Sequence, residues 1–252
     1  MPPGGRAGLA EFRVAGVSCL CREYLSEELR RIYGGGGSVF EELREQESTQ
    51  VLFGRQPLVA GMVASVPVLV KRLFHGGSLA LLTRDYFITP GRLRNHLSCA
   101  EFLTAKGVPT PETLFVSWRR RLGLVRGEIG VRYISRAFDA SSHLFLPPGE
   151  LPADWRERVA AIAALTARLH RLGVDHGDLN LRNFLFTPAG ELHILDLDKA
   201  VRRRSPLAAN ARRRNLARLE RSIRKQGKHA ATRDVEAIVH ALRVAYRSAY
   251  AS

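Results

Sequence analysis

The sequence predicts an α+β fold of two lobes, in which a small antiparallel sheet with one helix precedes a mainly helical second lobe. Short runs rich in Val and Leu, separated by Gly and Pro, recur between residues 48 and 135, as is typical of strands. After residue 152 the apolar residues repeat at helical spacing instead. The stretch PPGELP at 147–152 is a turn-rich connector between the two parts.

We therefore expect three segments. Residues 1–47 are expected to form an N-terminal appendage and linker, because a short helical stretch, LSEELRRIY, leads into the flexible sequence GGGGS. Residues 48–146 are expected to form the first lobe, and residues 147–252 the second. A chain of 252 residues fits one two-lobed domain or two small ones.

The first lobe is predicted to contain several strands and one helix. The strand-like runs are TQVLF, LVAGMV, VPVLVKRLF, TLFVSW and IGVRYIS. Thr89 followed by Pro90 predicts a helix start, and apolar residues follow at helical spacing until Gly107. The runs and turns together indicate an antiparallel sheet.

The second lobe is predicted to be built from three long helices and a short strand. Asp154 and Glu157 form a capping pair before a helical pattern that ends at Gly173. The strand is HILDLD, and two further helices are expected over about 212–226 and 233–249.

The charge balance predicts anionic partners. Lys and Arg outnumber Asp and Glu by 39 to 24, so the chain attracts nucleotide phosphates, anionic lipid headgroups or nucleic acid.

No run approaches the ~18 apolar residues that span a bilayer, and the N-terminus lacks the apolar core of a secretory signal. The 3 cysteines form no even disulfide set, which suits a reducing compartment. We expect a cytoplasmic protein.

The chemistry-bearing motif is HGDLNLRNF. Asp178 and Asn183 stand five residues apart, and Asp196 follows at the end of an apolar strand. Phosphoryl transfer needs a carboxylate to orient the attacking hydroxyl, and an amide with a second carboxylate to hold Mg²⁺ on the nucleotide phosphates. The joint pattern is shared by the protein-kinase-like superfamily. A lone HGD is more often a turn, but the whole pattern favours a kinase-like site, in which His176 is expected to support the loop.

Such a site also needs a cation from the sheet. Lys71 lies inside the apolar run VPVLVKRLF, where an unpaired ammonium would be costly to bury. We expect it to face a phosphate, with Arg72 on the other face as the alternative. Gly54 and Arg55, in a turn between two strands, would lie over the phosphates. That turn lacks a full G-x-G-x-x-G, so a plain hairpin stays open.

Five segments resemble the lipopolysaccharide kinases: VLVKRLFHGG, AKGVPTPE, LHRLGVDHGDLNLRNFLF, ILDLDKA and NLARLERSIRK. The resemblance is closest to the 3-deoxy-D-manno-octulosonic acid (Kdo) kinases, with inner-core heptose kinases as near relatives. It runs from about residue 65 to the end and leaves the first 60 residues unmatched.

The resemblance implies a kinase that transfers the γ-phosphoryl group of ATP to a sugar hydroxyl of the lipopolysaccharide inner core, on Kdo rather than heptose. It implies Asp178 as the catalytic base, Asn183 and Asp196 as Mg²⁺ ligands, and Lys71 as the cation that pairs with phosphate. ATP and Mg²⁺ are the implied cofactors, and the implied acceptor is a lipopolysaccharide-precursor glycolipid.

One position departs from the family pattern. His96 stands where relatives carry an ion-pairing Glu, and Glu101 lies about 140° further round the helix. Either the pair is made differently or activity is weakened. Asp198 and Lys199 extend the metal-binding turn as the family's Asp-x-Asp-basic sequence does.

Residues 202–228 hold many Arg and Lys and a single acid, Glu220. They are interpreted as a docking surface for the anionic inner membrane, with a merely solvated face as the alternative.

Three functions besides Kdo kinase remain open: a heptose kinase, another kinase-fold small-molecule or protein kinase, and a weakly active pseudokinase-like binding module. Nucleic acid is not favoured as a partner, because no aromatic residues interleave the basic run.

Overall fold

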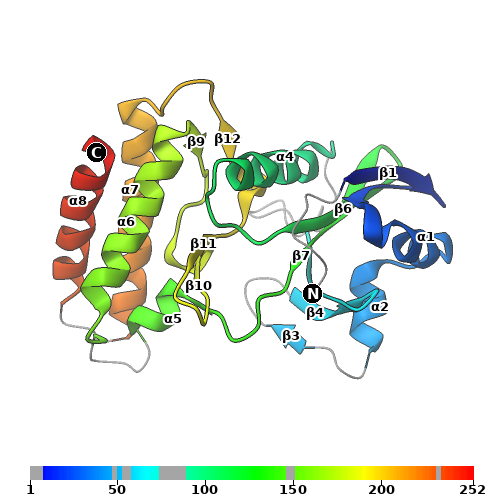
Figure 1. Cartoon of the computed structure of the whole chain (residues 1–252), viewed down its shortest axis with the longest axis horizontal. Helices are drawn as coiled ribbons and strands as arrows, with labels where there is room; N and C mark the ends of the chain where they lie inside the picture. Colours follow the sequence, from blue (N-terminus) through cyan, green and yellow to red (C-terminus); the bar gives the residue numbers. More distant parts are fainter. Residues whose placement is uncertain (1–7, 47–49, 53–57, 74–88, 146–150, 231–233) are drawn as a thin grey trace. The chain divides into compact units, whose positions relative to one another are not determined.

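The computed structural model describes residues 8–46, 50–52, 58–73, 89–145, 151–230 and 234–252. Two compact units form the chain: the first comprises residues 1–98 and 111–134, and the second residues 99–110 and 135–252. The large sheet belongs to the first unit and the long helices α6, α7 and α8 to the second (Figure 1). This confirms the predicted α+β class.

One seven-stranded antiparallel sheet forms the first unit, in the order β1-β2-β6-β7-β5-β4-β3. The strands are β1 (Leu9–Val14), β2 (Val17–Arg22), β3 (Gln50–Leu52), β4 (Leu58–Val63), β5 (Val66–Arg72), β6 (Thr113–Arg121) and β7 (Leu124–Arg132). Strand β5 is an interior strand of the sheet and pairs with β4 on one side and with β7 on the other. This places the basic end of VPVLVKR inside the sheet.

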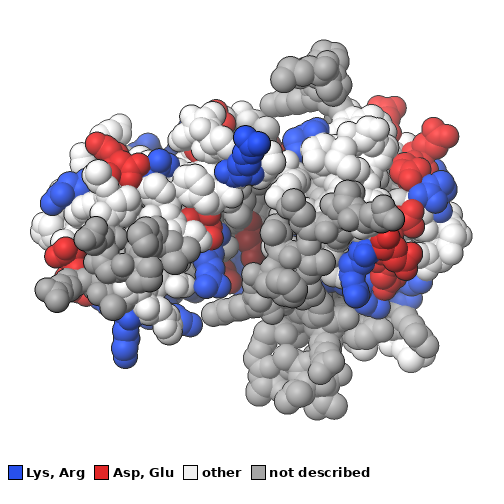
Figure 2. All heavy atoms as spheres, turned by 90° about the horizontal axis from the view of Figure 1, so that it is seen from below, with Lys and Arg blue, Asp and Glu red and all other residues white. Residues whose placement is uncertain are grey.

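Residues 8–46 form part of this unit, although residues 1–47 were expected to be an appendage. The β1–β2 hairpin extends the sheet beside β6, and helices α1 (Ser26–Gly34) and α2 (Val39–Glu45) cover one sheet face. Apolar side chains from both helices join the core of that face, among them Leu29, Ile32, Phe40 and Leu43. The outer side of α1 and α2 carries acidic and basic side chains side by side (Figure 2), as in the ion pairs of Arg31 with Glu28 and Glu42.

Helix α4 (Gly91–Ala105) packs on the opposite sheet face. Leu93 and Leu97 of this helix lie in a core cluster with Trp118 and Ile129. The predicted helix start and end are confirmed, because Thr89 Oγ1 accepts a hydrogen bond from Gly91 N and Gly107 has a φ of +67°. The two sheet faces therefore have separate helical covers.

Three long helices form the frame of the second unit, and they lie side by side (Figure 1). They are α6 (Trp155–Arg171), α7 (Ala209–His229) and α8 (Val235–Ala251), with the short α5 (Ala140–Phe145) beneath. All three long helices were predicted. The predicted cap is wrong in detail, because Asp154 makes no side-chain cap bond and instead pairs with His143 at 3.0 Å and Arg158 at 2.8 Å.

The division between the units differs from the predicted boundary at residue 146. The second unit begins at Ser135 and also takes residues 99–110, because the last turns of α4 share a core with α6. Among the described residues, none of the helices has the length and apolar character that a membrane-spanning segment needs.

Candidate active site

Two paired sets of short strands bring the motif residues of the second unit together. β9 (Val174–Asp175) pairs with β12 (Val201–Arg202), and β10 (Phe184–Phe186) pairs with β11 (Leu192–Ile194). The loop from β9 to β10 contains Asp178 and Asn183, and the turn from β11 to β12 contains Asp196. Because the two segments are joined by strand pairs at both ends, they are neighbours. Leu195 N donates to Asn183 O at 2.8 Å and ties them directly.

The backbone of Asp178 is held by amides of its own loop. Its carbonyl oxygen accepts hydrogen bonds from Asn180 Nδ2 at 2.9 Å and from Asn183 Nδ2 at 2.8 Å. The carboxylate is 44% exposed, and its Oδ2 lies 3.3 Å from Lys199 Nζ. A fixed backbone with an accessible carboxylate is the arrangement that a general base requires.

Gly177 allows this approach of the two segments. It has a φ of +73°, and a Cβ at this position would come within 2.5 Å of the Lys199 carbonyl oxygen. Any other residue would therefore be strained and would push the loop away from the turn. The glycine of HGD is thus needed for the Asp178–Lys199 contact.

His176 stabilises the turn that contains Leu195 and Asp196. It is 1% exposed, and its Nε2 lies 2.8 Å from the Leu195 carbonyl oxygen, to which it donates. Burial lowers the pKa of His176, although the Leu195 hydrogen bond and the carboxylates of Asp196 and Asp178 favour its protonation. A neutral, buried imidazole that binds a backbone carbonyl agrees with the predicted supporting role.

Asp196 has a left-handed backbone, with φ 58° and ψ 64°. Such a conformation is uncommon outside glycine, although Asp tolerates it better than most residues. Strained residues of this kind cluster at functional sites. A short helical turn, η3 (Leu197–Lys199), follows directly and contains the buried Asp198.

The oxygen donors of this site suit Mg²⁺. Asn183 is buried and uses its amide nitrogen to bind the Asp178 carbonyl, which leaves its amide oxygen as a donor for a metal. Asp196 offers a carboxylate in the neighbouring turn, and amide and carboxylate oxygens are the ligand types that Mg²⁺ prefers when phosphates supply further ligands. Within the described ranges, no cluster of three or more His, Cys, Asp or Glu could hold a metal.

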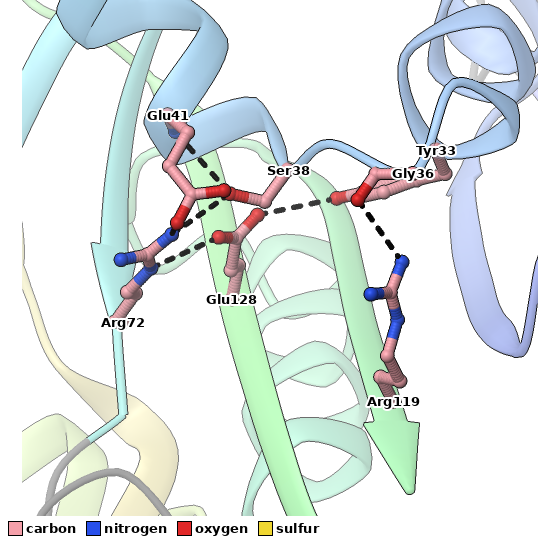
Figure 3. A network of polar contacts seen from close by, with 7 residues as sticks. All are labelled: Tyr33, Gly36, Ser38, Glu41, Arg72, Arg119 and Glu128. Atoms are coloured by element: carbon pink, nitrogen blue, oxygen red, sulfur yellow. Dashed lines mark hydrogen bonds and ion pairs between the residues drawn. The ribbon is translucent and has the colours of Figure 1, made fainter. Parts of the chain in front are cut away.

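In the first unit, Lys71 and Arg72 lie on opposite sheet faces. Lys71 pairs in register with Ile129, on the face that α4 covers. Arg72 lies on the other face, where it contacts Glu128 at 3.2 Å and Glu41 at 2.7 Å (Figure 3). Arg72 thus takes part in ion pairs with carboxylates of the first unit.

Two predicted positions cannot be placed, because Gly54 and Arg55 lie outside the described residues. His96 is described: it lies on α4 and is 4% exposed, near Leu93 and Leu97. An imidazole thus occupies the interior position where the family resemblance implies a carboxylate.

The sequence did not predict two contacts of the loop that contains Asp178. Asn180 holds the Asp178 carbonyl and also accepts a hydrogen bond from Arg182 N at 3.0 Å. Its place in DLN could have indicated such a turn. Ser222 Oγ accepts from Leu181 N at 3.2 Å, across 41 residues, and no local signal predicts it.

Comparisons with known proteins agree with this geometry. The model of the lipopolysaccharide kinase (Kdo/WaaP) family matches residues 39–246. The match begins earlier than the resemblance at residue 65 and includes α2, β3 and β4.

Several relatives are similar over most of the chain. The 3-deoxy-D-manno-octulosonic acid kinase of Xanthomonas campestris pv. campestris (strain B100) is 30% identical over 72% of this chain and 71% of its own length. The enzyme of the same name from Xanthomonas oryzae pv. oryzae (strain PXO99A) is 31% identical over the same shares. That of Xylella fastidiosa (strain M12) is 31% identical over 62% of this chain and 61% of its own length. The chain therefore belongs to the lipopolysaccharide kinase (Kdo/WaaP) family and is an ATP-dependent phosphotransferase that acts on a sugar hydroxyl.

Proposed function

We propose that this kinase transfers the γ-phosphoryl group of ATP to a hydroxyl of Kdo in a lipopolysaccharide-precursor glycolipid. The observation that carries the proposal is the Asp178 carboxylate, which is accessible while its backbone is fixed by two amides. Relatives named as Kdo kinases support Kdo over heptose as the acceptor sugar.

Asp178 would act as the base. One carboxylate oxygen lies 3.3 Å from Lys199 Nζ, and the other can accept the proton of the acceptor hydroxyl. As the proton moves to Asp178, the hydroxyl oxygen attacks the γ-phosphorus and the bond to the bridging oxygen of ADP breaks. The loop therefore orients the nucleophile rather than forming a covalent intermediate.

Asn183 and Asp196 would hold Mg²⁺ through their side-chain oxygens, and Lys71 would pair with the nucleotide phosphates. When bound, Mg²⁺ neutralises charge on those phosphates. The backbone bond between Leu195 and Asn183, at 2.8 Å, keeps the two proposed ligands in fixed register. His176 maintains that register through its own bond to Leu195.

One assay tests the acceptor. The purified protein is incubated with Mg²⁺ and radiolabelled ATP, and with either Kdo-bearing lipid A or heptose-bearing core, and the labelled product is identified. We expect phosphate on Kdo. Label on heptose alone would favour the second family activity, and ATP turnover independent of either sugar would favour another kinase-fold activity.

The membrane association is also a proposal. A glycolipid acceptor is embedded in the inner membrane, and the exposed basic residues Arg202, Arg203 and Arg204 precede the basic helix α7. Each basic side chain near an anionic surface contributes about 1 kcal/mol, which supports peripheral binding at the cytoplasmic face. Co-sedimentation with anionic and neutral vesicles at two salt concentrations would measure it.

A further inference from the structure

Helix α7 is hydrogen-bonded to the loop that contains Asp178. Ser222 Oγ accepts a hydrogen bond from Leu181 N at 3.2 Å, and Leu181 follows Asp178 by three residues. Three residues of chain span at most about 10 Å, so the helix surface around Ser222 lies close to the proposed base. A ligand that reaches Asp178 can therefore also reach side chains on this part of α7.

Basic side chains form that part of the helix. Arg214, Arg218, Arg221 and Lys225 follow one another at spacings of four, three and four residues, which places them on one side of a helix. Arg218 and Lys225 lie one turn before and one turn after Ser222. We call these four residues the basic edge, and it extends about 16 Å along α7.

The basic edge differs from the other arginines of the same bundle. Arg224 contacts Glu236 at 2.7 Å, and Arg243 contacts Glu220 at 2.6 Å, so both serve to join α7 and α8. Arg221 and Lys225 are exposed, and no acid pairs with either side chain in the part of the chain that the structure describes. Within the described residues, the charges of Arg221 and Lys225 thus take part in no ion pair that stabilises the fold.

The remaining members of the basic edge are only weakly engaged. Arg218 contacts the Asn215 amide oxygen at 3.3 Å, and Arg214 lies 3.8 Å from Asp175. Like charges one turn apart destabilise a helix. An anion bound along the edge would relieve this repulsion, and guanidinium groups bind carboxylate and phosphate through paired hydrogen bonds.

We infer that the basic edge binds acidic groups of the acceptor glycolipid, and so holds the acceptor while its hydroxyl lies at Asp178. This inference rests on the proposed function. The acceptor is favoured over the nucleotide, because neither the proposed Mg²⁺ ligands, Asn183 and Asp196, nor the proposed phosphate-binding Lys71 is on α7. The acidic groups are carboxylate or phosphate, since both fit the same side chains.

The test uses a double variant with a matched control. Arg221→Gln with Lys225→Gln removes one Arg and one Lys from the basic edge. Lys106→Gln with Arg247→Gln removes the same charge from exposed positions elsewhere in the second unit. Steady-state kinetics are measured with a lipid-free Kdo oligosaccharide, with and without a phosphate group, and with the intact glycolipid in vesicles.

We expect the edge variant to raise the KM for lipid-free acceptor about tenfold, as for the loss of one charge-assisted contact. Its kcat and its KM for ATP should stay within about twofold of the parent, and the control variant should resemble the parent throughout. If the effect occurs only with the phosphorylated oligosaccharide, phosphate is the group bound. If it occurs with both, the Kdo carboxylate is bound.

Two results would overturn the inference. Unchanged KM for lipid-free acceptor, with loss only on vesicles, would make the edge a bilayer-docking surface. Equal effects in both variants would show a non-specific influence of net charge. If the parent protein phosphorylates no Kdo acceptor, the proposed function itself fails, and this is seen before any variant is compared.

Discussion

Replacing Arg72 by methionine removes one charge from a buried network and leaves its partners in place. The guanidinium contacts Glu128 at 3.2 Å and Glu41 at 2.7 Å, and it donates to Ser38 Oγ at 2.8 Å (Figure 3). Arg72 and Glu128 are 8% and 5% exposed, so solvent screens their attraction only slightly. The Glu41 side chain is half exposed, so its ion pair with Arg72 contributes less to stability than the buried pair with Glu128.

The expected cost follows from the carboxylate that remains. Removing one partner of a buried ion pair lowers the free energy of unfolding by about 3–5 kcal/mol, because the other charge is left uncompensated. Replacing both partners by apolar residues of similar volume is often neutral. We therefore expect Arg72→Met to be more destabilising than the double variant Arg72→Met with Glu128→Met.

The loss should depend on pH. Burial already raises the pKa of Glu128, and Arg72 opposes that rise. Without Arg72 the pKa rises further, so the protonated acid is favoured in the folded protein. A group with a raised folded pKa stabilises below its ordinary value and loses that contribution as pH rises. The loss in free energy of unfolding caused by Arg72→Met should thus be smaller at pH 5 than at pH 8.

Urea denaturation of the parent, both single variants and the double variant, at the two pH values, measures these differences. The cycle isolates the coupling between the two side chains. A cost below about 1 kcal/mol for Arg72→Met, or a double variant as unstable as the two single costs summed, would refute the reasoning.

Three further outcomes are expected. Asp178→Asn should abolish phosphoryl transfer and leave the unfolding curve unchanged, and substantial turnover by the folded variant would contradict its role as base. Asp196→Ala should remove Mg²⁺-dependent ATP binding in calorimetry, and an unchanged affinity would speak against it as a ligand. Burial lowers the pKa of His170 to about 4, so the folded protein favours the neutral imidazole. The free energy of unfolding should therefore fall by about 3 kcal/mol through His170 as the pH falls from 6.5 to 4. His170→Gln should therefore flatten the pH dependence of the unfolding free energy, and an identical slope would refute this.

The proximity of Asp178 and Asn183 could be predicted because both residues lie in one short stretch of sequence. They share a loop, and the amide that binds the Asp178 carbonyl comes from within that loop. The contact between Asp178 and Lys199 joins residues 21 positions apart. The sequence indicates only that a basic residue follows Asp196 and Asp198. Contacts across longer separations, such as Leu181 with Ser222, depend on how α7 packs and have no local signal.

The N-terminal part was predicted poorly for a similar reason. Strand β2 pairs with β6, so that Leu20 lies opposite Val116, and such a distant partner leaves no periodic pattern nearby. Helix α2 did carry a signal: Ser38 accepts a hydrogen bond from Glu41 N at 3.2 Å, and Ser-x-x-Glu is a capping box. The run of glycines before it favoured a linker instead. A flexible sequence can thus directly precede a packed helix.

A count of basic residues does not show which of them are engaged in the fold, and the three arginines at 212–214 have different surroundings. Arg212 donates to Tyr250 Oη at 2.7 Å and lies 4.2 Å over the tyrosine ring. Arg213, in contrast, is exposed and donates to the nearby Asn210. Replacing all three together would therefore mix destabilisation with loss of docking charge.

The single variants separate these effects. Arg212→Gln should lower the free energy of unfolding by about 1–2 kcal/mol through the lost tyrosine contact, which lowers Tm by a few degrees. Arg213→Gln should leave Tm unchanged and weaken co-sedimentation with anionic vesicles, more at low salt than at high salt. If Arg212→Gln kept the parent Tm, the Tyr250 contact would contribute nothing to joining α7 and α8. If Arg213→Gln bound vesicles as the parent does, this end of α7 would be a solvated face, and bilayer docking would have to come from residues 202–204.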